Sequence, residues 1–166
     1  MDKSIIKVRS MSFKYADKYI FKDFDMDIDT NSFVCIIGRN ASGKSTLVKI
    51  LGGLCKASGY INVDGYLLND TYIKKIRRSL AICFDDADRH FIGDTVFDDL
   101  AFSLENLGYF PKEIENMVNN IAKKFKIDDI LDLPAEKIND SEKEKVMIAS
   151  SLIFNPKILL LDESIH

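Results

Sequence analysis

Residues 38–46, GRNASGKST, restrict the possible folds of this chain more than any other stretch. They fit the pattern G-x-x-x-x-G-K-[ST], in which glycines let the main chain curl and point successive N–H groups inward. A continuously apolar run, FVCIIG, precedes the loop, and a helical pattern, KSTLVKILGGL, follows it. A buried strand, this loop and a helix N-terminus together hold phosphate oxygens in many proteins. The sequence therefore predicts a phosphate-binding loop, with an ordinary glycine turn as the alternative.

A nucleotide site also needs a cation near the phosphates and oxygen ligands for Mg²⁺, and the sequence offers residues for both. Lys44 is expected to reach the β- and γ-phosphates, and Ser45 to offer its hydroxyl to Mg²⁺. The apolar run ILLL ends in Asp162 and Glu163. We expect Asp162 to hold Mg²⁺ through water, and Glu163 to orient or deprotonate an attacking water. The other loop residues expected around the phosphates are Gly38, Asn40, Ala41, Ser42, Gly43 and Thr46.

The order of patterns along the chain predicts an α/β fold. The first third is strand-like, and in YIFKDFDMDID apolar residues alternate with aspartates at 23, 25, 27 and 29. YINVDG and SLAICF are expected strands on either side of a short basic helix, TYIKKIRR. Residues 94–154 are expected to be mainly helical, and KILLLDE to be a last strand. In PKEIENMVNNIAKKFK, an apolar stripe at helical spacing predicts core packing. We assign residues 1–84 and 155–166 to an α/β core, and residues 85–154 to a helical subdomain.

Composition indicates which kinds of partner the protein binds and in which cellular compartment it works. The formal net charge of −3 argues against a nucleic-acid partner, which usually meets a basic face. The three cysteines lack CxxC spacing and sit among apolar residues, so we expect buried, reduced thiols in a cytosolic protein. The start of the chain, MDKSIIKVRS, is not a secretory signal, and no run approaches the roughly 18 apolar residues of a membrane helix. We therefore expect any membrane connection to run through a partner.

Taken together, these motifs resemble the ATP-binding subunit of an ABC transporter, most closely the energy-coupling-factor type that drives uptake of vitamins, cobalt or nickel. The similarity runs from about Ile5 to Glu163. GRNASGKST and ILLLDE match the family's two nucleotide motifs, and Tyr15 in SFKY falls where the family places an aromatic that stacks on adenine. A packed strand residue is the alternative for Tyr15. FDDADRHFIGDTVFDDLAFSLENLG resembles the segment that helps form the groove for the membrane partner's coupling helix.

The resemblance implies a P-loop NTPase (RecA-like) core with an N-terminal antiparallel β region and a helical subdomain, here without the last core strand and helices. It implies ATP and Mg²⁺ as cofactors. It also implies two partners, a second ATP-binding subunit and an integral-membrane transporter subunit, at the cytoplasmic face of the cell membrane. The transported substrate is not predictable, because separate membrane subunits select it in this family.

Three departures from the family pattern bear on hydrolysis. Asp85 stands where the family has a glutamine that touches Mg²⁺ and the water, so we expect it to approach the metal with a shorter reach. The signature L-S-G-G-Q reads INDSE at 138–142, which would turn two carboxylates toward a polyanion. A helix cap by Asp140 or Ser141 is the favoured interpretation of that stretch. The chain ends at LLLDESIH, before the family's last core strand and switch histidine, and His166 lies too close to Glu163 to be that histidine.

These departures predict an asymmetric heterodimer with weakened or partner-dependent hydrolysis. Whether the chain is unstable alone, is completed by a partner, or is part of a longer protein stays open. The main alternative is a non-hydrolysing regulatory subunit or truncated remnant, although Glu163 counts against it. A small P-loop kinase is less supported, because the β-rich start and Tyr15 fit a transporter ATPase better. Its phosphate clamps would be Arg39, Arg77, Arg78 and Arg89.

Overall fold

The computed structural model describes residues 4–84 and 91–162. The chain divides into two compact units, an N-terminal unit of residues 1–80 and a C-terminal unit of residues 81–166. Asp85 and Glu163 lie outside the described residues.

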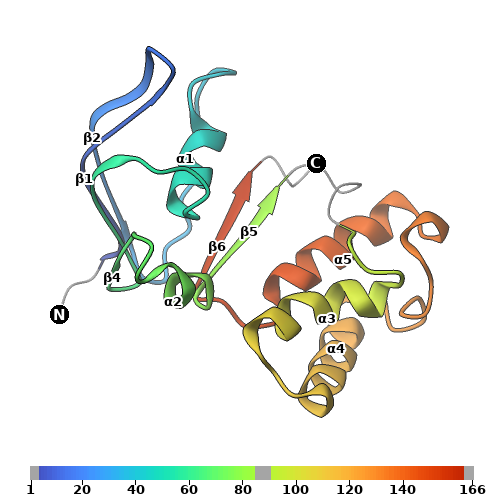
Figure 1. Ribbon diagram of the computed structural model, residues 1–166. Helices are drawn as coiled ribbons and strands as arrows, with labels where there is room; N and C mark the ends of the chain where they lie inside the picture. The colour runs from blue at the N-terminus through green and yellow to red at the C-terminus, as the bar shows by residue number, and fades with distance from the viewer. Residues whose placement is uncertain (1–3, 85–90, 163–166) are drawn as a thin grey trace. The chain divides into compact units, whose positions relative to one another are not determined.

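An antiparallel sheet forms one side of the N-terminal unit (Figure 1). Its four strands run in the order β2-β1-β3-β4. They are β1 (Ser4–Tyr15), β2 (Lys18–Asp29), β3 (Ser58–Val63) and β4 (Tyr66–Leu67). The predicted alternation of β2 is confirmed, since Phe24, Met26 and Ile28 are half-buried while Asp23, Asp25 and Asp27 are exposed. The outer carboxylates are partly paired, because Arg9 donates to Asp27 at 2.6 Å, and this hydrogen bond lowers the pKa of Asp27.

Two helices complete the N-terminal unit. Helix α1 (Lys44–Leu51) follows the glycine loop, and α2 (Ile73–Arg77) is the predicted short basic helix. The α1 helix ends as its glycine pair predicts, since the Gly52 N–H donates to the Val48 carbonyl at 3.0 Å. The buried apolar residues of this unit come from the sheet and from both helices; they include Ile6, Val8, Met11, Leu47, Ile50, Leu51, Ile61, Val63 and Ile76.

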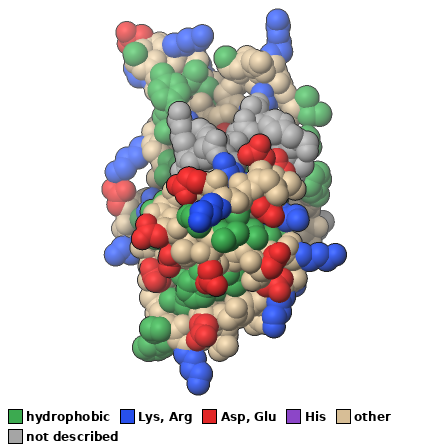
Figure 2. All heavy atoms as spheres, turned by 90° about the vertical axis from the view of Figure 1, so that its right-hand side faces the viewer, with side chains coloured by type: hydrophobic (Ala, Val, Ile, Leu, Met, Phe, Trp, Pro, Cys, Tyr) green, Lys and Arg blue, Asp and Glu red, His purple; other side chains and the backbone are tan. Residues whose placement is uncertain are grey.

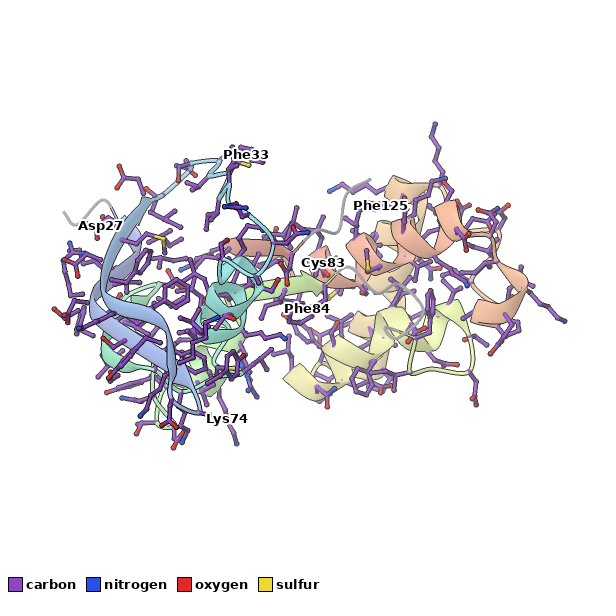
Figure 3. All side chains as sticks on the ribbon, turned by 90° about the horizontal axis from the view of Figure 1, so that it is seen from above. Asp27, Phe33, Lys74, Cys83, Phe84 and Phe125 are labelled. Atoms are coloured by element: carbon purple, nitrogen blue, oxygen red, sulfur yellow. The ribbon has the colours of Figure 1, made fainter. Side chains whose placement is uncertain are left out.

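The apolar run before the loop is not a strand in this structure. Phe33 is 94% exposed and Ile37 is 90% exposed, and Figure 3 shows Phe33 at the edge of the N-terminal unit. A continuously apolar run becomes a buried strand only where other strands pair with it and layers cover both faces. Residues 33–38 pair with no strand of the described chain, so the prediction of a buried parallel strand here is wrong.

The same segment corrects the prediction for the cysteines. Cys35 is exposed because the run that carries it is not packed, and Cys55 is half-buried just after α1. Only Cys83, on strand β5, is buried as expected. The apolar neighbours in the sequence therefore indicated burial correctly for just one of the three thiols.

The C-terminal unit combines a short sheet with a helical block. Strands β5 (Leu80–Phe84) and β6 (Ile158–Asp162) form a two-stranded sheet, and their arrows point the same way in Figure 1. Between them in the chain lie α3 (Val96–Leu107), α4 (Pro111–Phe125), the 3₁₀ helix η2 (Ala135–Lys137) and α5 (Asp140–Leu152). This order confirms the strands at 79–84 and 157–162 and the helical character of residues 94–154.

Helix α4 shows why these segments fold as predicted. Pro111 occupies the first helical position, where its missing N–H costs nothing, and Glu113 accepts a hydrogen bond from the Phe110 N–H at 2.9 Å. The apolar stripe faces one hydrophobic core with residues of α3 and α5, which confirms that it is core packing. Its members are Ile114, Met117, Val118, Ile121 and Phe125.

Candidate nucleotide-binding site

The glycine loop forms a tight turn at the start of α1. The Ser42 N–H donates to the Arg39 carbonyl at 3.0 Å, and Ala41 has a positive φ of 61°. A Cβ added to Gly38 would lie 2.6 Å from Ser42 Oγ, so the two ends of the loop approach each other closely. The loop therefore has the curled main chain that the motif predicts.

Gly43 is the residue that joins this loop to the helix and to the sheet. It caps α1 with φ 101° and ψ 6°, in the left-handed region that side chains rarely adopt. A Cβ at this position would lie 2.7 Å from Ile20 Cγ2 and 3.0 Å from Phe21 Cζ. Both the backbone conformation and the approach of β2 thus require glycine here.

The first turn of α1 offers positive potential to an anion. No acidic residue lies in this turn, so the positive end of the helix is not offset by a local carboxylate. The Lys44 Nζ donates to the carbonyls of Gly38 at 3.1 Å and Arg39 at 3.4 Å, so the ammonium folds back over the start of the loop. Ser45 and Thr46, both half-buried, belong to the same turn, while Asn40 lies exposed in the loop. The structure thus brings all the predicted loop residues together.

Tyr15 ends β1 and remains open to solvent. Its side chain is 49% exposed, and its ring meets that of Phe13 at 89° with centroids 4.8 Å apart. Phe13 is paired across the hairpin with Phe21, the residue that supports Gly43. The end of the hairpin that carries Tyr15 is therefore the end that the phosphate loop contacts.

Asp162 is the last residue of β6 and is half-buried. Asp85 directly follows Phe84, the last residue of β5. Because neighbouring strands that point the same way end at one edge of a sheet, Asp162 and Phe84 lie at that edge. Serine hydroxyl and aspartate carboxylate oxygens, as in Ser45 and Asp162, are donors that suit Mg²⁺.

The stretch at 138–142 is a closed helix cap. Asn139 caps α5, accepting from the Glu142 N–H at 3.0 Å, and Glu142 accepts from the Asn139 N–H at 2.9 Å. A cap was predicted here, but it is Asn139 and not Asp140 or Ser141. The reason is the reciprocal bond with Glu142, since only a cap at 139 places that glutamate at the third helical position. The spacing N-x-x-E was the signal that would have identified it.

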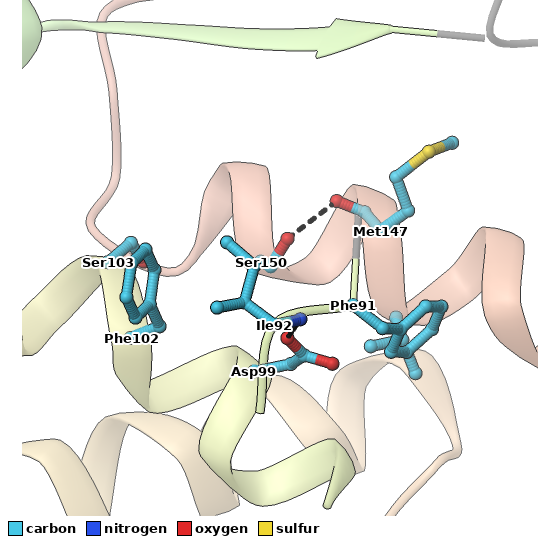
Figure 4. A pocket seen from close by; sticks show the side chains of 8 residues that line it. Phe91, Ile92, Asp99, Phe102, Ser103, Met147 and Ser150 are labelled. Carbon is cyan, nitrogen blue, oxygen red and sulfur yellow. Dashed lines mark hydrogen bonds between the residues drawn. The ribbon is translucent and has the colours of Figure 1, made fainter. Parts of the chain in front are cut away.

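The sequence did not predict a cavity of about 90 Å³ in the C-terminal unit (Figure 4). Beside it, Asp99 on α3 accepts hydrogen bonds from the Ile92 N–H at 2.7 Å and the Gly93 N–H at 3.0 Å. The cavity is lined by Phe91, Ile92, Asp99, Phe102, Ser103, Val146, Met147 and Ser150. Of the predicted nucleotide-site residues that the structure describes, none lines this cavity.

Acidic and basic side chains are interspersed over the face of the molecule seen in Figure 2. Within residues 4–84 and 91–162, the structure has no helix long and apolar enough to cross a membrane.

Comparison with known proteins places these features in a family. The family model for ABC transporters matches residues 21–166. The energy-coupling factor transporter ATP-binding protein EcfA1 of Mesomycoplasma hyopneumoniae strain J is 40% identical over 163 residues, covering 96% of this chain and 60% of that protein. EcfA of Pediococcus pentosaceus is 38% identical over 165 residues, covering 97% of this chain and 59% of the relative.

A solved structure gives the same result. CbiO1 from Clostridium perfringens, described as part of the ABC transporter complex CbiONQ, superposes with a TM-score of 0.83 at 31% identity. The match covers 96% of this chain and 65% of that one. The chain thus spans about 60% of the length of the curated relatives it matches. With its P-loop NTPase core and a family match over most of its length, the chain belongs to the ABC transporter family.

Proposed function

We propose that this chain binds Mg-ATP as the ATP-binding subunit of an energy-coupling transporter, and couples it to uptake of a small molecule or metal ion through membrane partners. One observation carries the proposal: the curled loop at 38–43 ends in a left-handed Gly43 and opens into the acid-free first turn of α1. Main-chain amides and the helix N-terminus then face the phosphates. The names of EcfA1 and EcfA support the transporter class.

Each predicted residue has a part in this proposal. Lys44, which now bonds to two loop carbonyls, turns toward the β- and γ-phosphates, and Tyr15 stacks on the adenine. Ser45 and Asp162 hold Mg²⁺, which would neutralise charge on the phosphates, and Asp85 approaches it as well. Glu163 orients or deprotonates the water. For these groups to act together, residues 1–84 and 155–166 form one core, with residues 85–154 as the helical subdomain.

The partners follow from the same class. CbiO1 is described as part of a complex, and the curated relatives are named as transporter subunits, so we place this chain at the cytoplasmic face of the membrane, bound to an integral-membrane subunit. A second ATP-binding subunit completes a heterodimer. The closed cap at Asn139 supports asymmetry in that pair, because Glu142 and Asp140 put negative charge where the other subunit's ATP would bring phosphates.

A lysine exchange tests the binding proposal. Lys44→Ala should weaken Mg-ATP binding by about tenfold or more, because a charge-assisted hydrogen bond to phosphate is lost. Lys49→Ala, in the last turn of the same helix, is the matched control and should leave affinity unchanged. Isothermal titration calorimetry of the three proteins measures both effects. Equal affinity in wild type and Lys44→Ala contradicts the proposed site.

The second candidate, a regulatory subunit that binds ATP without hydrolysing it, is favoured by the same closed cap. Turnover of wild type and Glu163→Gln, measured alone and with a partner subunit, separates the two. Faster turnover by the wild type supports an ATPase. Identical rates in both settings support the regulatory subunit.

A further inference from the structure

Aromatic residues of the β1–β2 hairpin lie between Tyr15 and the phosphate loop. The rings of Tyr15 and Phe13 are nearly perpendicular, with centroids 4.8 Å apart. Phe13 lies opposite Phe21 in the antiparallel ladder, and directly opposed residues project from the same face of a sheet. Phe21 in turn reaches Gly43, where its Cζ lies 3.0 Å from the position of a Cβ.

Burial of these rings fits a supporting role. Phe13 and Phe21 are half-buried, whereas Tyr15 is 49% exposed. The Phe24 ring also packs against Phe21, at a centroid distance of 5.2 Å. A perpendicular aromatic contact restricts rotation of a ring without covering all of it. Tyr15 therefore keeps exposed surface for a base while Phe13 limits its movement.

We propose that Phe13 and Phe21 are positioning residues for nucleotide binding. Phe13 orients the ring that receives the base, and Phe21 supports the turn that receives the phosphates. Together they fix the distance between the ring that binds the base and the loop that binds the phosphates. The inference rests on the proposed function. Neither phenylalanine contacts the nucleotide in this proposal; each acts through the residue that it positions.

The two roles separate when the ligand lacks a base. Mg-ATP uses both the Tyr15 ring and the loop, whereas inorganic tripolyphosphate with Mg²⁺ uses the loop alone. Phe13→Leu should therefore raise the Kd for Mg-ATP about fivefold and leave the Kd for tripolyphosphate unchanged. Phe21→Leu should raise both. Calorimetric titration of the full chain with each ligand gives these values, and a purely structural loss of folded protein would not alter one Kd alone.

Two controls keep the result interpretable. Phe110→Leu makes the same exchange at a ring that is 75% exposed in the C-terminal unit, and should change neither Kd. Phe13→Tyr keeps the aromatic ring and should bind Mg-ATP as tightly as the wild type. It remains informative even if Phe13→Leu folds poorly. Thermal unfolding of each variant monitors the fraction folded.

The outcomes distinguish the inference from the function. If Phe13→Leu changes both ligands equally or neither, or if Phe21→Leu fails to weaken both, the positioning roles are overturned while ATP binding through Lys44 stands. If Lys44→Ala leaves the affinity for Mg-ATP unchanged, the proposed function itself fails.

Discussion

At the scale of single residues, Gly43 is the position where conformation and packing act together. Its φ of 101° and the neighbouring Ile20 side chain both exclude a Cβ. Gly65 shares the positive φ, at 82°, but a Cβ there would meet nothing within 4 Å. Comparing Gly43 with Gly65 therefore distinguishes the energetic cost of backbone strain from the cost of a steric clash.

Replacing each glycine by alanine should therefore have different effects. Gly65→Ala should lower the free energy of unfolding by about 1 kcal/mol through strain alone, and leave nucleotide binding intact. Gly43→Ala should cost roughly 1–3 kcal/mol more, because the methyl group overpacks against β2, and should weaken Mg-ATP binding. Urea unfolding and calorimetry measure the two quantities. Similar losses of stability in both variants would show that β2 does not restrain the loop.

The site was predictable from sequence where chemistry requires a residue type at a fixed spacing. The loop from Gly38 to Thr46 folds as its glycines and the helical pattern after them indicated. The supporting contacts were not predictable, because Phe21 meets Gly43 only through the tertiary packing of the hairpin on the loop. The sequence separation of Phe21 and Gly43 gives no indication that the two residues meet.

At the scale of elements, periodic segments were predictable and a continuously apolar one was not. Helix α4 carries a 3.6-residue stripe, and β2 alternates with a period of two, so each specifies its own buried face. Residues 33–37 have no such period. Their conformation depends on which strands lie beside them, and none of the described strands pairs with them.

Helix α5 shows how a cap fixes the start of an element. Asn139→Ala removes the side-chain acceptor of the Glu142 N–H, so we expect the free energy of unfolding to fall by about 1 kcal/mol. Ser141→Ala, at an exposed position of the same first turn, is the matched control and should change it by less than about 0.5 kcal/mol. Thermal or denaturant unfolding compares them. Equal losses of stability in the two variants would mean that the Asn139–Glu142 cap contributes nothing specific to α5.

At the scale of the whole molecule, hydrophobic residues of one type occupy opposite environments. Ile50 on α1 is fully buried, whereas Ile37, directly before Gly38 of the phosphate loop, is 90% exposed. Ile50→Ala should lower the free energy of unfolding by about 2–5 kcal/mol through loss of burial and creation of a cavity. Ile37→Ala should change it by less than about 0.5 kcal/mol. A large loss for Ile37→Ala in denaturant unfolding would show that residues 33–37 are packed in solution.

The sheet of the N-terminal unit also sets an order of events during synthesis. Strands β1 and β2 are joined by a tight turn and can pair as soon as both have left the ribosome, but β1 also pairs with β3, where Ile6 lies opposite Val63. Closing that ladder must bring together chain positions far apart in sequence, which is slow because loop entropy is lost before the contacts form. The phosphate loop and α1 lie within the enclosed segment. A nascent chain can therefore present the β1–β2 hairpin, whose Ile20 and Phe21 meet Gly43, before β3 has been translated and has closed the sheet.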